Sequence, residues 1–482
     1  MKTPALVFDA HTIGRQLNDM AQQDGVRTDA DRRTREYYAQ GNVKTLWIDR
    51  GGVDSRADSL LVWLRQVDAM GMNQQAFMVK PIEDDLRRLR TLDVDGGENS
   101  INRVAARLEY RLTKACMRYC YGQRFGFVNP HRVFNHLDVE RVDSVRRITR
   151  YRGLFDMSMD LPTAGYAAEV IGKIMNDSLT EYLRDIQPQS KFYQTLKGML
   201  AQAANDEQRQ RIICNMERAR WRLHHPIPDE GKRVVVNIPA YELYAYGGDT
   251  VLNMRVVCGA QKTKTPQLTS EVEWMEVNPQ WVIPMSIVEK DVVRHTGDSA
   301  YFARNKYTIY EKATNKELSV GEVSRSMLLS GKYRIAQKSG ADNSLGQIVF
   351  RFKNAFSVFL HYTSSPWVFQ RDSRAISHGC VRVEKPFQLA EFVLENPDEW
   401  LLDRIRISMD LRPQTDRGRH YLATHRNEKE HKLIGYVPVK PHVPLYIIYY
   451  TIWTDRQGAL QTWPDVYGYD KVLWACLQTF VN

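Results

Sequence analysis

Ser377, His378, Gly379 and Cys380 follow one another directly in the sequence, and a second histidine, His361, lies upstream. A cysteine attacks carbonyl groups as a thiolate, and an imidazole beside it can take the thiol proton. The small glycine permits a sharp backbone turn and leaves amide N–H groups near the sulfur, where they can bind an oxyanion. The pattern indicates nucleophilic catalysis by Cys380.

Two other interpretations of these residues stay open at this point. A lone cysteine is more often a small buried hydrophobe than a nucleophile, and a lone histidine usually only makes hydrogen bonds. His361, His378 and Cys380 would also supply three ligands of a zinc site. Neither a fourth ligand nor a CxxC pair lies nearby in the sequence, so we expect no metal.

The flanking residues predict how the histidine and the cysteine are positioned. Apolar and aromatic residues over 350–360 favour a strand that ends at His361, where a rigid sheet supports a catalytic base. A proline and several polar residues predict that 362–376 is a loop that folds Cys380 back toward the histidine. Residues 387–394 have helical spacing, so we expect the cysteine to lie near a helix N-terminus that lowers the pKa of its thiol.

The six cysteines of the chain are too sparse and irregular for a disulfide framework. Cys116 and Cys120 lie four residues apart on one face of a predicted helix, a geometry that seldom permits a disulfide. We interpret them, together with Cys258 and Cys476, as packing residues.

The sequence around the two candidate residues resembles the signature of a known family. His361, fifteen intervening residues and then Ser377-His378-Gly379-Cys380 are similar to the signature of the L,D-transpeptidases, cysteine acyltransferases that cross-link peptidoglycan. Further blocks resembling that domain follow in order: Val235–Tyr241, Gly259, Thr265-Pro266, Asn278–Pro284 and Asn343–Gly346. Together they cover most of residues 232–400, and they look closest to the long, lid-bearing periplasmic form of enteric bacteria.

The resemblance implies a reaction and a role for each site residue. Cys380 attacks the carbonyl that precedes the terminal D-alanine of a donor stem tetrapeptide, and His361, oriented by the backbone carbonyl of Tyr362, moves the proton. The thioester then passes to an acceptor stem amine and gives a 3-3 cross-link, without metal or organic cofactor. Backbone amides of Cys380 and Gly379, with His378 as a secondary member, form the oxyanion hole.

Three further residues are expected to contact the substrate: Arg382, Ser377 and Trp281. The commonest family signature has asparagine two positions after the cysteine, whereas this chain, like the enteric long form, has Arg382. Its planar guanidinium suits a contact with the loop or with a substrate carboxylate. Some relatives have a tyrosine where this chain has Phe359, so no phenolic hydroxyl assists from that position. Trp281 fits the wall of a substrate groove and equally well a packing position.

We expect an α+β chain of several domains, because 482 residues exceed the size of a single hydrophobic core. Helical spacing predicts a helical scaffold domain over 1–190 and a helical linker over 191–231. Strand-forming residues predict a β-rich catalytic domain over 232–412, with a lid insertion at about 287–340. A charged segment and a β-hairpin over 413–482 are expected to pack on the catalytic domain. The linker is too short for the peptidoglycan-binding repeat of the enteric relative.

The insertion has two interpretations. In the resembling enzymes it caps the active site, and a lid that excludes water would favour an amine acceptor over hydrolysis. The alternative is a surface elaboration without gating.

Composition restricts the partners. The net charge of +10 suits an anionic polymer such as the cell wall, and it would suit nucleic acid equally well. No nucleic-acid motif occurs and basic residues are scattered among acidic ones, so we expect no nucleic-acid partner. No run approaches the ~20 apolar residues that span a bilayer, and the N-terminus has no adequate signal-peptide core. Because the resemblance implies export, we expect a periplasmic or envelope protein whose signal or anchor is absent from this chain.

Alternative functions remain open. The same thioester passed to water would make an L,D-carboxypeptidase, and passed to a protein lysine it would attach a protein to peptidoglycan. A wall-binding structural module with a vestigial site is the non-enzymatic alternative. Acylation of Cys380 by carbapenem-type β-lactams is expected from the same chemistry.

Overall fold

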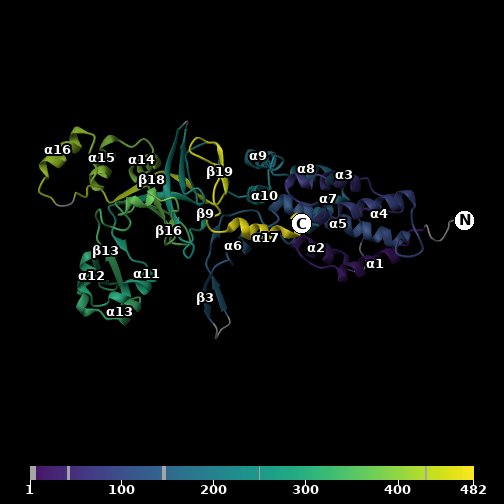
Figure 1. Cartoon of the computed structure of the whole chain (residues 1–482), viewed down its shortest axis with the longest axis horizontal. Coiled ribbons are helices and arrows are strands. Elements are labelled where there is room, and N and C mark those ends of the chain that lie inside the picture. The colour runs from purple at the N-terminus through teal and green to yellow at the C-terminus, as the bar shows by residue number, and fades with distance from the viewer. Residues whose placement is uncertain (1–6, 41–43, 144–147, 249, 429–430) are drawn as a thin grey trace.

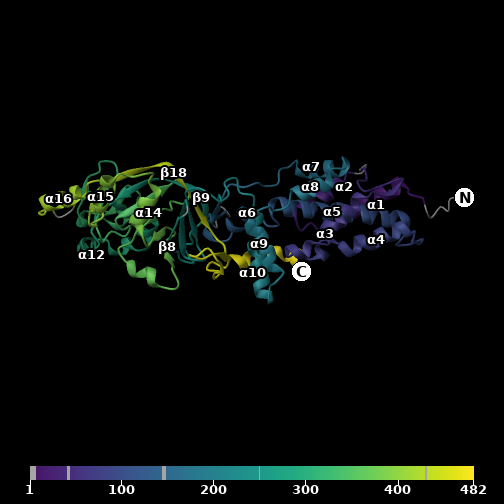
Figure 2. The ribbon, with the colours of Figure 1, turned by 90° about the horizontal axis from the view of Figure 1, so that it is seen from above.

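The computed structural model describes residues 7–40, 44–143, 148–248, 250–428 and 431–482. The molecule is elongated, with a helical body at one end and a large sheet followed by further helices toward the other (Figures 1 and 2). A smaller module of short strands and helices lies beside the sheet (Figure 1). This arrangement confirms the predicted α+β class with a helical N-terminal part and a β-rich part behind it.

The helical body is built around one long helix. α5 (Ile101–Phe125) buries residues on all its sides, and the amphipathic helices α1, α2, α3, α4 and α7 pack against it. The other helices and 3₁₀ turns of the body are α1 (Ala10–Gln23), α2 (Asp29–Tyr38), α3 (Arg56–Leu64), η2 (Val67–Met70), η3 (Gln74–Phe77), α4 (Val79–Thr91), α6 (Pro130–Phe134), α7 (Tyr166–Met175) and α8 (Leu179–Asp185). Two strand pairs accompany them, β1 (Ile48–Asp49) with β2 (Gly52–Val53) and β3 (Val139–Asp143) with β4 (Ile148–Tyr151).

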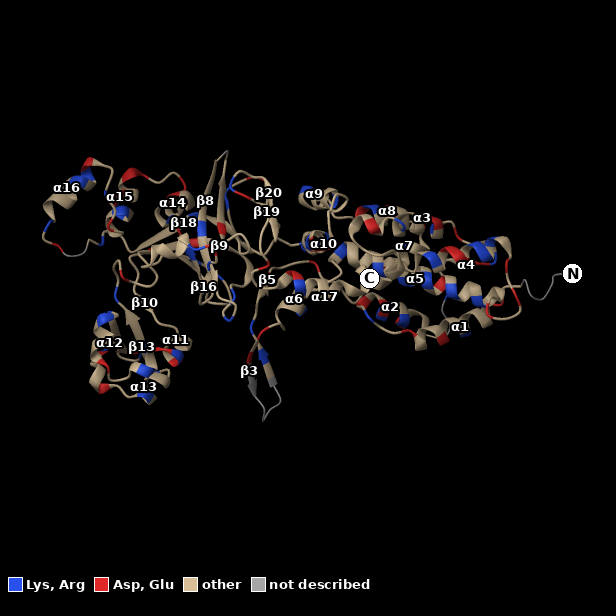
Figure 3. Cartoon of the chain, viewed as in Figure 1, with Lys and Arg blue, Asp and Glu red and all other residues tan. Residues whose placement is uncertain are grey.

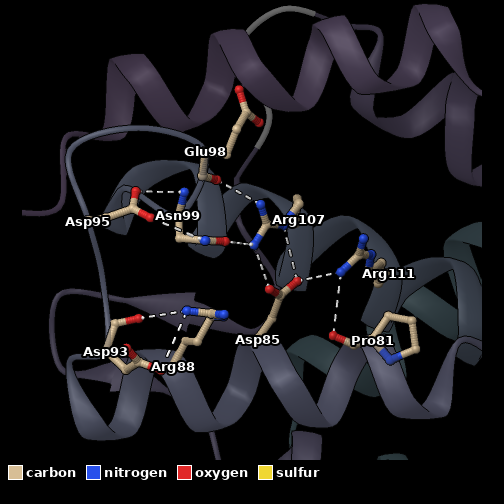
Figure 4. Close-up of polar contacts among 9 residues, drawn as sticks. All are labelled: Pro81, Asp85, Arg88, Asp93, Asp95, Glu98, Asn99, Arg107 and Arg111. Carbon is tan, nitrogen blue, oxygen red and sulfur yellow. Dashed lines mark hydrogen bonds and ion pairs between the residues drawn. The ribbon is translucent and has the colours of Figure 1, made fainter.

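A buried carboxylate joins α4 to α5 in addition to their apolar contacts. Asp85 on α4 accepts hydrogen bonds from Arg107 Nη2 at 2.7 Å and Arg111 Nη1 at 2.6 Å on α5 (Figure 4). The two guanidinium groups also donate to the carbonyls of Glu98 and Pro81. Because Asp85 is only 3% exposed, removing its two partners would leave an unpaired buried charge.

The segment predicted as a linker contains α9 (Lys191–Leu200) and α10 (Asp206–Arg220). The sequence of α10 is polar, yet the helix is buried between α9, α5 and the C-terminal helix α17 (Tyr469–Val481). Arg218 and Arg220 are buried with it and pair with Asp470 and Glu217. Because these charges are paired, a helix whose polar sequence is typical of a linker can be buried inside the molecule.

The large sheet closes on itself. Its strands follow the order β14-β15-β17-β8-β7-β6-β18-β9-β5, and β9 also pairs with β14. β6 is the β-branched run predicted to open the catalytic domain, and all five of its residues are buried. The strands are β5 (Phe155–Asp156), β6 (Arg233–Asn237), β7 (Glu242–Gly247), β8 (Thr250–Gly259), β9 (Gln267–Val277), β14 (Ile348–Phe352), β15 (Leu360–His361), β17 (Val381–Val383) and β18 (Tyr436–Ile448), and β16 (Ala375–Ser377) pairs with β8 at the side.

The insertion predicted at about 287–340 corresponds to a module with a sheet of its own, which we call the inserted module (residues 281–337). Its four strands, β10 (Trp281–Val282), β11 (Tyr307–Glu311), β12 (Glu317–Leu318) and β13 (Tyr333–Gln337), accompany α11 (Met285–Lys290), η4 (Val292–His295), α12 (Ser299–Arg304), η5 (Val320–Glu322) and α13 (Arg325–Leu329). It also has a separate hydrophobic core, formed by Ile283, Val288, Val292, Phe302, Ile309, Val323, Leu328 and Ile335. The prediction of a lid insertion did not include this sheet.

The C-terminal part does more than the predicted charged segment and hairpin. After α14 (Pro386–Val393), α15 (Glu399–Ser408) and α16 (Asp416–Thr424), β18 enters the middle of the sheet between β6 and β9. The predicted hairpin is β19 (Ile452–Thr454) with β20 (Leu460–Thr462). Residues 413–482 were expected to pack on the catalytic domain, and α17 in addition packs on α10 and on η3 of the helical body.

No helix within the described ranges has both the length and the apolar composition to cross a bilayer.

Candidate active site

Strand pairing brings the predicted base and nucleophile to one face of the sheet. β15 and β17 are parallel neighbours, with Leu360 opposite Val381 and His361 opposite Arg382. The Val381 amide donates to the Phe359 carbonyl at 3.1 Å, which continues the pairing back toward Cys380. Because paired residues share a face and side chains alternate along a strand, His361, Arg382 and Cys380 project from the same face.

The thiol of Cys380 lies in crowded surroundings. It is partly exposed, and its Sγ lies 3.9 Å from the carbonyl oxygen of Ser357, toward which the thiol donates. Burial raises the pKa of Cys380 to about 11, and the Phe359 backbone, Arg351 and Arg382 oppose that rise only in part. The cysteine is therefore a neutral thiol at neutral pH.

His361 is held neutral as well. Its side chain is buried, and this burial, assisted by the positive charge of Arg382, lowers the pKa of the imidazole to about 3. The backbone of Tyr362 and of Leu345 acts in the opposite direction. Nδ1 is buried without a hydrogen-bond partner of good geometry. A buried imidazole nitrogen without a partner is costly and is typical of a group poised for a proton.

The expectation that a helix N-terminus lowers the thiol pKa is wrong. α14 begins only at Pro386, and β17 lies between Cys380 and that helix. The helix dipole acts mainly within the first turn, so it does not offset the burial of the sulfur. The predicted loop over 362–376 also contains a short 3₁₀ turn, η6 (Pro366–Gln370).

Ser377 and Gly379 differ from their predicted roles. Ser377 is buried, and its hydroxyl donates to the Cys380 carbonyl at 2.6 Å and accepts from the Gly379 amide at 3.1 Å. Ser377 therefore stabilises the turn before the cysteine instead of facing substrate, and the Gly379 amide is engaged within that turn. Gly379 has φ +121°, a conformation that other residues rarely adopt. His378 is exposed beside the turn.

Two threonines from the β8–β9 connection hold the turn of residues 377–379 through hydrogen bonds. Thr263 Oγ1 donates to the Ser377 carbonyl at 2.7 Å, and Thr265 Oγ1 donates to the Gly379 carbonyl at 2.8 Å. Gly259 permits this close approach, because a Cβ there would lie 2.0 Å from the Thr263 carbonyl oxygen. In the sequence, Gly259 and Thr265 supported only the resemblance to the family. The structure shows that the Gly259 amide donates to Thr265 Oγ1.

Tyr362 is positioned by the root of the inserted module. Gly346 packs so closely against it that a Cβ would lie 2.6 Å from the Tyr362 Cβ, and φ at Gly346 is +65°. The Asn343 side chain holds this turn by accepting from the Leu345 amide at 2.8 Å and donating to the Lys338 carbonyl at 2.9 Å. The segment that leaves the module thus reaches the residues around His361.

Arg382 and Trp281 lie in different surroundings. Arg382 is partly buried on the face of His361, and its Nε is buried without a hydrogen-bond partner. Trp281 is partly buried and packs against the core of the inserted module. Its packing interpretation is thus met in part, while the exposed remainder of the ring stays available to a ligand.

Sequence reasoning missed a basic residue beside the site. The Arg351 guanidinium lies 4.5 Å from the centre of the Phe359 ring, and Phe359 in turn packs edge-on against His361 with ring centres 5.5 Å apart. Glu276 holds Arg351 through contacts at 3.1 and 3.0 Å. The alternation of β14 contains no signal for this pairing, because Glu276 comes from the neighbouring strand β9.

The other cysteines lie on other elements and differ from Cys380 in burial. Cys116, Cys120, Cys214 and Cys258 are buried as free thiols, in keeping with a packing role. Cys476 is exposed on α17, so its predicted packing role is wrong. Across the part of the chain that the structure describes, no cluster of three or more His, Cys, Asp or Glu side chains is arranged to hold a metal ion.

Comparison with known proteins agrees with this geometry. The family model for the L,D-transpeptidase catalytic domain matches residues 231–407, and the model for the Scaffold domain matches residues 32–200. A protein of Haemophilus influenzae (strain ATCC 51907 / DSM 11121 / KW20 / Rd) named "Putative L,D-transpeptidase" is 27% identical over 307 residues. That match covers 62% of this chain and 57% of the relative's length. Residues 231–407 of this chain therefore resemble the L,D-transpeptidase catalytic domain, and residues 32–200 before them resemble the Scaffold domain.

Proposed function

We propose that the protein is a peptidoglycan L,D-transpeptidase that uses Cys380 as nucleophile and His361 as general base. One observation carries the proposal: the parallel pairing of β15 with β17 directs both side chains from the same face of the sheet, within the matched catalytic domain. The non-enzymatic alternative gives no reason to bury an imidazole whose Nδ1 lacks a partner on the sheet face that also carries a thiol.

The reaction starts from a neutral thiol and a neutral imidazole. A preformed thiolate–imidazolium pair is unfavourable, because the pKa of Cys380 is raised to about 11 and that of His361 is lowered to about 3. His361 therefore takes the thiol proton as the sulfur attacks the carbonyl that precedes D-alanine. The tetrahedral intermediate collapses, the C–N bond breaks, and the imidazolium returns the proton to the departing D-alanine amine. An acceptor stem amine then attacks the thioester, and the thiol re-forms.

Neighbouring groups support each stage. The Cys380 amide and the exposed His378 are the remaining candidates for the oxyanion site, since the Gly379 amide is engaged by Ser377. The Tyr362 backbone stabilises the protonated imidazole. The unpaired Nε of Arg382 provides a donor for a substrate carboxylate on the same face. Trp281, which is partly buried in the inserted module, remains the candidate for the wall of the substrate groove.

The acceptor and the location complete the proposal. A stem amine as acceptor yields a 3-3 cross-link, and this function places the protein in the periplasm or cell envelope, where it would contribute to cell-wall strength and shape. Transfer to water, or to a protein lysine, is the alternative outcome of the same thioester. Carbapenem-type β-lactams should acylate Cys380, because they present a strained carbonyl to the same thiol.

The proposal is tested with purified protein and disaccharide or free tetrapeptide stems. Wild-type protein should release D-alanine and form dimers, whereas Cys380→Ala should do neither. Cys476→Ala is the matched control, since it removes an exposed cysteine far from the sheet face and should retain full activity. A carbapenem should add its mass to the wild type and to the control, but not to Cys380→Ala. Dimer formation by Cys380→Ala would exclude the mechanism.

A further inference from the structure

A hydroxyl from the C-terminal segment is hydrogen-bonded to the end of β8 and to the β8–β9 connection, which holds the turn before the candidate nucleophile. Tyr467 lies between β20 and α17 and is only 3% exposed. Its hydroxyl donates to the Gly259 carbonyl at 2.6 Å and accepts from the Thr265 amide at 3.1 Å. A buried hydroxyl that both donates and accepts fixes its two partners relative to each other.

The side chain of Thr265 extends this hydrogen-bond network to the residue before Cys380. Its Oγ1 accepts from the Gly259 amide at 2.8 Å and donates to the Gly379 carbonyl at 2.8 Å. Each hydroxyl in this network therefore donates one hydrogen bond and accepts one, and the last acceptor is the carbonyl of the residue before Cys380. A buried network in which every group is satisfied is rigid, and losing one member affects the others.

Tyr467 is itself held from two directions. Its amide donates to the Tyr449 hydroxyl at 2.7 Å, and that hydroxyl donates to Asp465 Oδ1 at 2.7 Å. The rings of Tyr449 and Tyr467 are stacked with their centres 5.8 Å apart. We call these three residues, Tyr449, Asp465 and Tyr467, the tyrosine brace.

The helical body anchors the brace. Asp470, which opens α17, pairs with the buried Arg218 of α10 at 2.6 Å, and its amide donates to Asp465 Oδ2 at 3.0 Å. Thr451 donates to Asp470 at 2.6 Å and connects the same cluster to the end of β18. The position of the Gly379 carbonyl is thus determined in part by residues that lie outside the matched catalytic segment 231–407.

We propose that Tyr467 is a positioning residue for Cys380: through Gly259 and Thr265 it holds the Gly379 carbonyl, and so holds the turn in the conformation that presents the thiol to His361 and to the substrate. Tyr467 contacts neither reacting atom, and its effect is on the orientation of the nucleophile. This inference rests on the proposed function of Cys380.

Tyr467→Phe tests the role with little change in shape. The variant keeps the stacked ring but leaves the Gly259 carbonyl and the Thr265 amide without their partner. The rate constant for alkylation of Cys380 by iodoacetamide, counted per folded molecule, should fall about 5- to 10-fold, the factor expected for one lost buried hydrogen bond. The kcat for dimer formation should fall by a similar factor, while KM changes less than about twofold because the substrate contacts remain.

A control variant at a second buried tyrosine separates an effect on the position of Cys380 from a general loss of stability. Tyr244 is equally buried, and its hydroxyl donates to the Thr454 carbonyl of the C-terminal hairpin at 2.7 Å, but nothing connects it to Gly379. Tyr244→Phe should lose comparable stability and keep the wild-type alkylation rate and kcat. Thr265→Val should reproduce the Tyr467→Phe defect, and Thr265→Ser, which retains the hydroxyl, should restore most of the rate.

The outcomes are distinguishable from failure of the proposed function. If Cys380→Ala is inactive but Tyr467→Phe alkylates and turns over as the wild type does, the positioning role is overturned and the nucleophile stands. If Cys380→Ala still forms dimers, the proposed function falls, while the alkylation rates continue to report on the turn. Should Tyr467→Phe not fold, equal alkylation rates for Thr265→Val and Thr265→Ser would overturn the inference.

Discussion

At the scale of single residues, the site combines two neutral groups that an isolated reading of the motif would have expected to be charged. The motif predicted that folding brings an imidazole and a thiol together, and strand pairing directs both from one face of the sheet, while their roles as base and nucleophile stay a proposal. It did not predict their protonation states, because the pKa of each group depends mainly on burial by the surrounding strands and in part on the charge of Arg382. The spacing of residues along the motif does not encode that burial. The proposed mechanism therefore requires that the proton moves from the thiol to the imidazole within the enzyme–substrate complex.

The first prediction concerns the reactivity of Cys380 in the free protein. Since its pKa is raised to about 11, the thiolate fraction should increase about tenfold for each pH unit from 7 to 10. Iodoacetamide alkylation in the Cys476→Ala background, measured by mass spectrometry, should therefore accelerate over that range without a plateau. A plateau reached below pH 8 would show that the free protein stabilises the thiolate.

The second prediction concerns the stability of the catalytic domain in acid. His361 has its pKa lowered from 6.5 to about 3, so between these values the unfolded chain binds a proton that the folded one does not. Stability should therefore be lost as pH falls below 6.5, by at most about 1.4 kcal/mol per pH unit from this residue. His361→Gln, which stays neutral, should lose less stability than the wild type between pH 6.5 and 4.5 in urea titrations. Parallel losses in the two proteins would contradict a buried neutral imidazole.

At the scale of elements, the sequence predicted one strand over 350–360 that ends at His361, whereas the structure divides it into β14, which ends at Phe352, and the two-residue β15. The sequence also missed the strand that follows Cys380. Alternating apolar and aromatic residues mark β14 and the approach to β15, whereas β17 has three residues, too few for a period to appear. Its parallel pairing with β15 is a non-local contact. The helix predicted over 387–394 corresponds to α14, but because β17 was not predicted, the N-terminus of this helix was wrongly expected to lower the pKa of the thiol.

The α4–α5 pair provides the third prediction. Asp85→Asn leaves the guanidinium groups of Arg107 and Arg111 without their buried carboxylate (Figure 4). The helical body should lose about 2–4 kcal/mol of its free energy of unfolding, because breaking a buried ion pair leaves unpaired charge. Urea unfolding followed by far-UV circular dichroism measures the loss. Asp84→Asn, on the same helix but with a largely exposed partner in Lys80, is the control and should change stability by less than about 1 kcal/mol.

At the scale of the whole molecule, the C-terminal helix packs against the N-terminal helical body. α17 packs on α10 and η3, and the Asn73 amide donates to the Phe480 carbonyl at 2.7 Å, so the last helix joins the helical body to the sheet. Sequence patterns predicted the helical and β-rich parts but not this return, because α17 carries no signal for its partner. Acidic and basic side chains are interspersed along the described ribbon (Figure 3), so the net charge of +10 does not gather on one element.

The inserted module offers the last prediction, because its two ends meet. Val282 pairs with Ala336, and the Ile283 amide donates to the Ile335 carbonyl at 2.8 Å. A two-residue Asn-Gly turn between residues 283 and 335 can therefore replace the module, with both isoleucines changed to threonine because they lose their core. Since the module has its own hydrophobic core, the large sheet should fold without it and Cys380 should still be acylated by a carbapenem. If the module excludes water from the thioester, the ratio of cross-linked dimer to hydrolysed tripeptide should fall several-fold. The products are separated by chromatography after reaction with tetrapeptide stems, and an unchanged ratio would mean that the module is a surface elaboration without a gating role.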